Sequence, residues 1–165
     1  ILAEMERIFV LGDFDLKPVE KGFAITERGD YKLGSWPEQG LVFYPEEVGY
    51  EKSFNLDEKQ PVKIVLTDWK GTVAAVKVNG KDAGIIGWNP YELDVSEYVK
   101  SGENNVEVVV YGSPFNLLGP HYYEPPKGIA TPWSWNRAPE EQPAGDDYIF
   151  LDYGLKEDFT VMISN

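Results

Sequence analysis

The sequence contains no cysteine and a single histidine, His121. It can form no disulfide, no thiolate metal site and no thiol nucleophile, and it offers no cluster of the nitrogen and sulfur ligands that zinc prefers. The lack of cysteine is compatible with an extracellular protein whose fold does not depend on oxidation. A serine hydrolase would have to use His121 as its base, but no Gly-x-Ser-x-Gly motif is present. We interpret His121 as a hydrogen-bonded loop residue.

Basic residues are also scarce, with 15 Lys and Arg against 28 Asp and Glu and a net charge of -13. A nucleic acid requires a basic surface, and an anionic membrane attracts basic segments, so the charge argues against both partners. We expect acidic pairs such as Glu46-Glu47, Asp57-Glu58 and Glu140-Glu141 to form a solvated coat. Such a coat suits a neutral sugar better than a uronate.

Long apolar runs are missing as well, since the longest are of the order of Val108-Val109-Val110. Nothing in the sequence predicts a membrane span, and no basic segment followed by an apolar segment indicates a signal peptide. The chain begins at Ile1 without an initiator methionine. We therefore expect residues 1–165 to form a single domain that has been excised from a larger protein.

Short segments with apolar residues at every second position dominate what is present, and no window keeps a helical period for three turns. Asn79-Gly80 predicts a two-residue hairpin turn, because both residues tolerate positive φ. Val106, Val108 and Val110 are expected on the buried face of one strand. The pattern predicts eight to ten strands in an antiparallel β-sandwich. The main segments are Arg7–Phe14, Phe23–Thr26, Tyr50–Leu56, Pro61–Trp69, Thr72–Val78, Lys81–Ile86, 106–111, Tyr148–Tyr153 and Phe159–Ile163.

The segment Asp94–Lys100 is the one candidate for a helix, a turn or two long, with Asp94 or Ser96 as its N-cap and Gly102 as its stop. The preceding Glu92-Leu93-Asp94 also resembles the alternating acids of some sandwich glycanases. That motif needs a third acid two residues after the aspartate so that all three face the cleft. Ser96 occupies this position, so we favour a capping role over a catalytic one.

The proline-rich segment Ser113–Asp147 shows little strand pattern, and a long loop of this kind is often functional. Sugars are bound by flat aromatic faces together with planar polar groups. We predict a stacking platform in this segment, joined by one tryptophan from the loop before Pro90. Its members are Trp133, Trp135, Tyr122, Tyr123, Trp88, Asn136 and Arg137. In the alternative interpretation the loop folds over the sandwich or packs on a neighbouring domain. Trp36 and Trp69 are assigned to the core or to fold-specific packing in either case.

Hard cations need only oxygen ligands, so calcium is the one metal for which the sequence offers candidate ligands. These are the pairs Asp146-Asp147 and Asp13/Asp15. The alternative is a solvated acidic surface, and no other cofactor is indicated.

Three segments in order carry a resemblance to a known family: Ala75–Gly84 with its Val-Asn-Gly-Lys, Pro90–Ser96, and Gly102–Val110 with its Gly-Glu-Asn-Asn. They resemble the sugar-binding jelly-roll domain of glycoside hydrolase family 2 and its relatives. Upstream, Gly12-Asp13-Phe14, Trp36 with Gln39-Gly40, Phe43-Tyr44 and Tyr50 with Phe54 are similar to the same domain in large bacterial rhamnosidase-like glycosidases, as is Asn116–His121 downstream. The match covers residues 9–121.

The resemblance implies a galactose-binding-like jelly roll, and it implies that the catalytic carboxylates of the parent lie in a separate barrel. We therefore predict a non-catalytic carbohydrate-binding accessory domain of a secreted or periplasmic bacterial glycoside hydrolase. Its expected partners are a neutral carbohydrate and the catalytic domain of the parent protein. The alternative is a purely structural sandwich that packs on the catalytic domain without binding sugar. A self-contained glycanase is a third and disfavoured interpretation.

Overall fold

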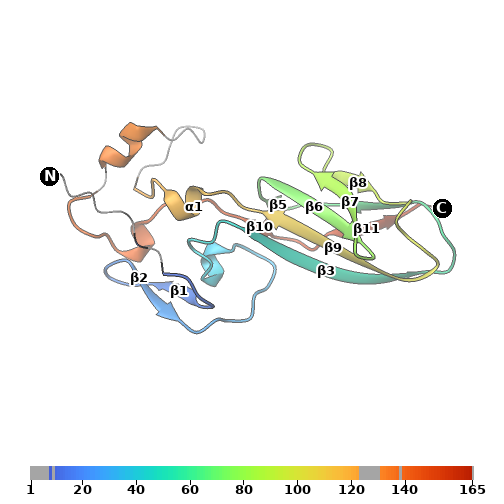
Figure 1. Ribbon diagram of the computed structural model, residues 1–165, viewed down its shortest axis with the longest axis horizontal. Helices are drawn as coiled ribbons and strands as arrows, with labels where there is room; N and C mark the ends of the chain where they lie inside the picture. Colours follow the sequence, from blue (N-terminus) through green and yellow to red (C-terminus); the bar gives the residue numbers. More distant parts are fainter. Residues whose placement is uncertain (1–7, 9, 123–130, 138, 165) are drawn as a thin grey trace.

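Antiparallel strands supply nearly all of the regular structure in this computed structural model, which describes residues 8, 10–122, 131–137 and 139–164. Figure 1 shows a sandwich of long strands at one end and shorter elements at the other. The strands of the sandwich are β3 (Glu47–Leu56), β4 (Val62–Val65), β5 (Trp69–Lys70), β6 (Val73–Val78), β7 (Lys81–Ile86), β8 (Glu92–Asp94), β9 (Gly102–Tyr111), β10 (Gly154–Leu155) and β11 (Thr160–Ile163). The prediction of an antiparallel β-sandwich is confirmed.

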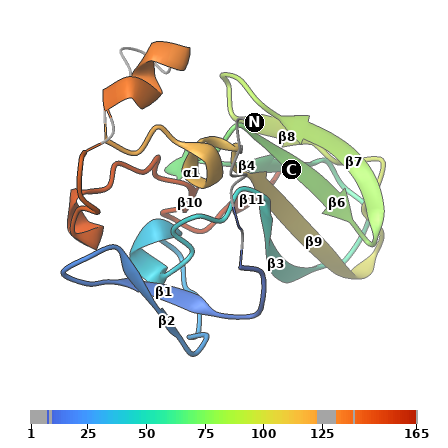
Figure 2. The ribbon, with the colours of Figure 1, turned by 60° about the vertical axis from the view of Figure 1, so that its left-hand side comes forward.

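The larger sheet has the strand order β3-β9-β6-β7. Its β6–β7 hairpin pairs Val78 with Lys81, which leaves Asn79 and Gly80 as a two-residue loop. Both loop residues have positive φ, +52° and +76°, as the sequence predicted. Figure 2 shows the twist of this sheet along β9 and β6.

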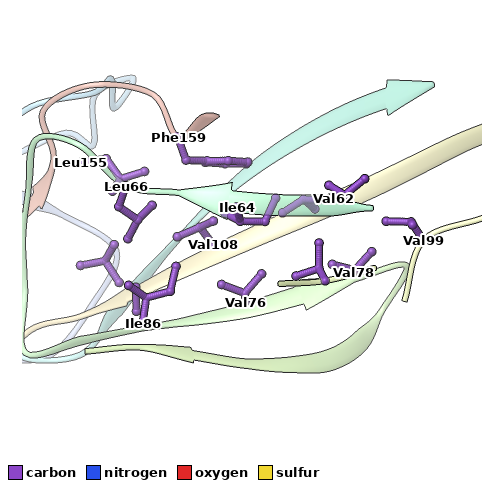
Figure 3. Close-up of a cluster of buried hydrophobic side chains, with 14 of the residues drawn as sticks. Val62, Ile64, Leu66, Val76, Val78, Ile86, Val99, Val108, Leu155 and Phe159 are labelled. Atoms are coloured by element: carbon purple, nitrogen blue, oxygen red, sulfur yellow. The ribbon is translucent and has the colours of Figure 1, made fainter. Parts of the chain in front are cut away.

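The smaller sheet has the order β11-β4-β8 and faces the larger one across the core. Side chains of Val62 and Ile64 on β4 lie opposite Val76, Val78 and Val108 of the larger sheet (Figure 3). Alternate residues along β4, β6 and β9 are buried because successive side chains of a strand point to opposite faces. The predicted inward face of Val106, Val108 and Val110 is confirmed.

The other end of the molecule holds a small hairpin and several short helices. The hairpin joins β1 (Asp15–Pro18) to β2 (Phe23–Thr26). Around it lie the helix α1 (Phe115–Leu118) and the 3₁₀ helices η1 (Pro37–Gln39), η3 (Pro132–Arg137) and η4 (Gly145–Asp147) (Figures 1 and 2). Among the described residues, no helix has the length and apolar character needed to cross a bilayer.

Two predicted strands are absent from the described residues. Of the segment Arg7–Phe14, residues 8 and 10–14 form no strand, and β1 begins only at Asp15. Residues 148–153 also form no strand, although the aromatic residues Tyr148 and Phe150 stand two positions apart as they would on one face of a strand. Their two rings stack with an interplanar angle of 9° and a centroid distance of 6.0 Å. Ring packing rather than strand pairing therefore explains this alternation.

The predicted helix at Asp94–Lys100 is wrong. Asp94 ends β8, and the residues after it form a turn in which the backbone N–H of Ser96 donates to the Asp94 carboxylate at 2.9 Å. The amide of Tyr98 closes the turn by donating to the carbonyl of Val95. Asp94 therefore caps a turn that is too short to be a helix.

Candidate functional site

The structure places two of the predicted platform residues in open solvent. Trp133 lies on η3 and is 77% exposed, and Trp88 lies in the loop between β7 and β8 and is 71% exposed. Figures 1 and 2 show η3 and the β7–β8 loop on separate parts of the molecule. The two rings are both available to a ligand, but they do not form one platform.

Tyr122 occupies a different environment from these two tryptophans. It is 37% exposed and packs edge-on against Tyr148, with ring centroids 5.4 Å apart. It borders an aromatic cluster in which Phe23, Phe43, His121, Tyr148 and Phe150 contact one another. Tyr123 lies outside the described residues, as do the side chains of Trp135, Asn136 and Arg137, whose backbone belongs to η3.

His121 is buried, and its Nε2 donates to the carbonyl of Asn116 at 2.9 Å. Asn116 in turn clamps Leu151, since its Nδ2 donates to the Leu151 carbonyl and its Oδ1 accepts from the Leu151 amide. This confirms the interpretation of His121 as a hydrogen-bonded loop residue. The assignment of Trp36 and Trp69 to the core is also confirmed: Trp36 is buried, and Trp69 packs against the central cluster.

Sequence reasoning missed a cleft of about 590 Å³ between the β1–β2 end of the molecule and the beginning of β3. Its lining combines aromatic rings, among them Phe14, Tyr31 and Tyr44, with the charged side chains of Asp13 and Arg28. These residues come from three separate segments. No local motif marks them, so the fold itself is needed to bring them together.

One wall of the cleft is fixed by Asp15, a buried carboxylate at the start of β1. The hydroxyl of Tyr31 donates to Asp15 Oδ1, and the backbone N–H of Gly29 donates to Oδ2 at 2.7 Å. Burial of the Tyr31 phenol, followed by this hydrogen bond, raises its pKa above the ordinary value. The guanidinium of Arg28 lies 5.1 Å from the centre of the Tyr31 ring, within the range of a cation–π contact.

The two acids that the sequence offered for catalysis have other partners. The Lys63 ammonium donates to Glu92 at 2.7 Å, and Asp94 accepts from the hydroxyl and amide of Ser96. Those two contacts lower the pKa of Asp94, whereas a general acid needs a raised one. Across the described part of the chain, no three acidic or histidine side chains gather closely enough to hold a metal ion.

The prediction that three acidic pairs lie on the solvated surface is confirmed. Both residues of each of the pairs Glu46-Glu47, Asp57-Glu58 and Glu140-Glu141 are exposed.

No family model matches the chain. Among curated proteins, it is 37% identical over 87 residues to a β-galactosidase of Thermoanaerobacter pseudethanolicus, a match that covers 49% of this chain and 10% of that enzyme. It is 28% identical over 121 residues to a putative β-glucuronidase of Formosa agariphila, with 68% of this chain and 10% of that protein covered. The chain resembles one segment of large glycosidases. The sequence-based resemblance is thereby confirmed.

A solved structure supports the fold. The rhamnosidase from Novosphingobium sp. PP1Y superposes with a TM-score of 0.55 and 20% identity over 98% of this chain and 16% of the rhamnosidase. The chain thus spans about a tenth of the curated relatives and about a sixth of this structure. What the rhamnosidase shares with the chain is the fold of one segment.

Proposed function

We propose that the chain is a carbohydrate-binding accessory domain of a secreted or periplasmic bacterial glycoside hydrolase and has no catalytic activity of its own. The observation that carries the proposal is the exposure of Trp88 and Trp133, at 71% and 77%. Each of these rings offers solvent a flat apolar surface, and the apolar face of a sugar stacks on such rings. The resemblance to segments of glycosidases supplies the biological context.

Two observations support the absence of catalytic activity: the small share of each glycosidase that the match covers, and the partners that the candidate acids already have. The matches cover about a tenth of each curated glycosidase, which leaves most of those chains for the reaction. In this chain, Glu92 is paired with Lys63, and Asp94 caps a turn. The expected result is no release of the chromogenic aglycone from aryl glycosides by the purified chain. Release that disappears in Glu92→Gln would overturn this part.

Sugar binding is tested by titrating the chain with methyl pyranosides of galactose, glucose, mannose and rhamnose while its tryptophan fluorescence is recorded. Calorimetry should give dissociation constants in the millimolar range, and removal of a stacking ring in Trp133→Ala or Trp88→Ala should weaken binding about tenfold. Ile85→Ala, at another exposed apolar position, is the matched control. If no sugar changes the fluorescence or gives a heat signal, the binding proposal fails.

A structural role is the second candidate, and an apolar strip on the outer face of the larger sheet favours it. Ala74 and Val76 point into the core, so Val73 and Ala75 point outward. Tyr111 pairs with Val73 and is 38% exposed, and Ile85 pairs with Ala75 and is 54% exposed. Exposed apolar patches of this kind commonly mark interfaces.

In the longer glycosidase that the structural role requires, Ile85→Lys should loosen the contact between the sandwich and its neighbour. The expected result is a lower melting temperature for the longer protein, with an unchanged melting temperature for the isolated chain. Equal melting temperatures of the variant and wild-type longer proteins would argue against this strip as the interface.

A further inference from the structure

The cleft beside Trp36 is built from preorganised groups, as a binding site requires. Its floor is Trp36, whose indole Nε1 donates to the hydroxyl of Tyr50 at 2.8 Å. Tyr44 lies edge-on to this indole, with ring centroids 6.1 Å apart, and its hydroxyl donates to the backbone carbonyl of Glu47 at 3.0 Å. A ligand that enters the cleft therefore meets aromatic side chains that are already held in place.

Another wall of the cleft is formed by the irregular segment that carries Arg28 and Tyr31. Asp15 holds this segment through the Gly29 amide and the Tyr31 hydroxyl. Gly40 packs directly on Asp15, because a Cβ at position 40 would lie 2.7 Å from the Asp15 Cβ. Asp15 is thus a positioning residue: it fixes the wall of the cleft without lining it.

The charges around the cleft define the class of ligand. Two cationic side chains, Arg28 and Lys32, and two anionic ones, Asp13 and Glu47, line it, so its formal charges cancel. Arg28 faces Asp13 at 3.4 Å, and both side chains remain largely open to solvent. A guanidinium only donates and a carboxylate only accepts, whereas a sugar hydroxyl does both. Adjacent hydroxyls of a neutral sugar therefore match this pair, and the net charge of -13 disfavours an anionic ligand.

We propose that this cleft is a binding site for one neutral pyranose residue, with Arg28 and Asp13 binding adjacent hydroxyls and the Phe14 and Tyr44 rings contacting the apolar face of the sugar. The volume of about 590 Å³ lies within the range of small-molecule sites. The inference rests on the proposed carbohydrate-binding function but assigns the sugar to residues other than Trp88 and Trp133.

The test is a nitrogen–proton NMR titration of the whole chain with the four methyl pyranosides and, separately, with sodium glucuronate. Backbone amides of Lys32 and Gly49 report on the cleft, and the indole signals of Trp88 and Trp133 report on the exposed rings. A neutral pyranoside should move the cleft amides. Arg28→Met and Asp13→Asn should each weaken that response at least fivefold. Lys21→Met, which removes an exposed charge outside the cleft, should leave it unchanged.

The outcomes separate this inference from the broader proposal. Shifts confined to the Trp88 and Trp133 indoles would overturn the cleft site and leave carbohydrate binding intact. A cleft response that Arg28→Met does not weaken, or tighter binding of glucuronate than of every neutral pyranoside, would also overturn it. If no sugar shifts any of the amide or indole signals, both proposals fail. Movement of the cleft amides alone would support the cleft and exclude the exposed tryptophans as the stacking surface.

Discussion

The Trp36 indole and the Tyr50 hydroxyl are joined by a hydrogen bond of 2.8 Å, with Tyr50 as the acceptor. The same oxygen accepts from the backbone N–H of Leu155 at 3.2 Å. Tyr50 on β3 thereby connects the segment before η1 to β10. The contact with Trp36 also requires Gly154, which has a φ of +123° and where a Cβ would lie 2.8 Å from the indole nitrogen.

Tyr50→Phe should destabilise the fold. Two donors, the Trp36 indole and the Leu155 amide, would lose their acceptor in a largely buried position, and the expected cost is about 2 kcal/mol. Urea denaturation gives the free energy of unfolding directly. Tyr111→Phe is the control, because Tyr111 lies on the exposed face of the larger sheet. A Tyr50→Phe variant as stable as Tyr111→Phe would show that the hydrogen bond contributes nothing measurable.

Tyr31→Phe should cost about 1 kcal/mol near neutral pH, because the buried Asp15 carboxylate would lose a hydrogen bond. The loss should depend on pH. The pKa of Tyr31 is raised in the folded state, so the stability that the phenol contributes is present below its unfolded pKa of about 10 and is lost as pH rises through the folded value. Denaturation of both proteins from pH 8 to pH 11 should show the difference narrowing with pH. A constant difference would contradict this account.

Asn104 is a fully buried amide whose hydrogen-bonding capacity is used in full. Its Nδ2 donates to the carbonyls of Lys100 and Gly102, and its Oδ1 accepts from the Lys100 amide and from the side chain of Asn79. Asn104→Ala should therefore lower the free energy of unfolding by about 3 kcal/mol, since several buried groups lose their partners together. Asn105→Ala, one residue along β9 and exposed, should be close to neutral in the same denaturation experiment.

Local sequence patterns predicted the parts of the fold that depend on local chemistry. Asn79-Gly80 predicted its turn because only a few residues tolerate two positive φ angles, and Val106, Val108 and Val110 predicted a buried face because a strand alternates. The same alternation at Tyr148 and Phe150 was misleading, because their rings pack on Phe23 and its neighbours instead of on a partner strand.

The candidate site was likewise predicted from the sequence only in part. Trp88 and Trp133 were found because tryptophan is conspicuous in any sequence, but the sequence could not reveal that the β7–β8 loop and η3, which carry them, lie apart in the fold. The cleft was missed because its residues are individually ordinary. Arg28 matters only because Asp13 and the Tyr31 ring lie beside it, and Tyr31 is positioned by its hydrogen bond to Asp15.

Asp94→Asn should reduce stability at neutral pH and have no effect in acid. The hydroxyl and then the amide of Ser96 hold the pKa of Asp94 below its ordinary value. A carboxylate with a lowered folded pKa contributes stability above its unfolded pKa of about 4, and this stability is lost as pH falls through the folded value. Urea midpoints of wild type and variant should therefore converge between pH 5 and about pH 2. Asp57→Asn, at another exposed acid, is the control.

Ile64 on β4 tests whether the two sheets are held together by the packing seen between them. Its side chain is fully buried, lies beside Val62 on β4 and faces the valines of the larger sheet (Figure 3). Ile64→Ala removes three buried carbons and leaves a cavity, so the expected loss is about 3 to 4 kcal/mol, and Ile64→Val should lose about 1 kcal/mol. Ile85→Ala, on the solvent side of β7, should change stability by less than about 0.5 kcal/mol. Similar losses for Ile64→Ala and Ile85→Ala would mean that the interior between the sheets is not the stabilising core.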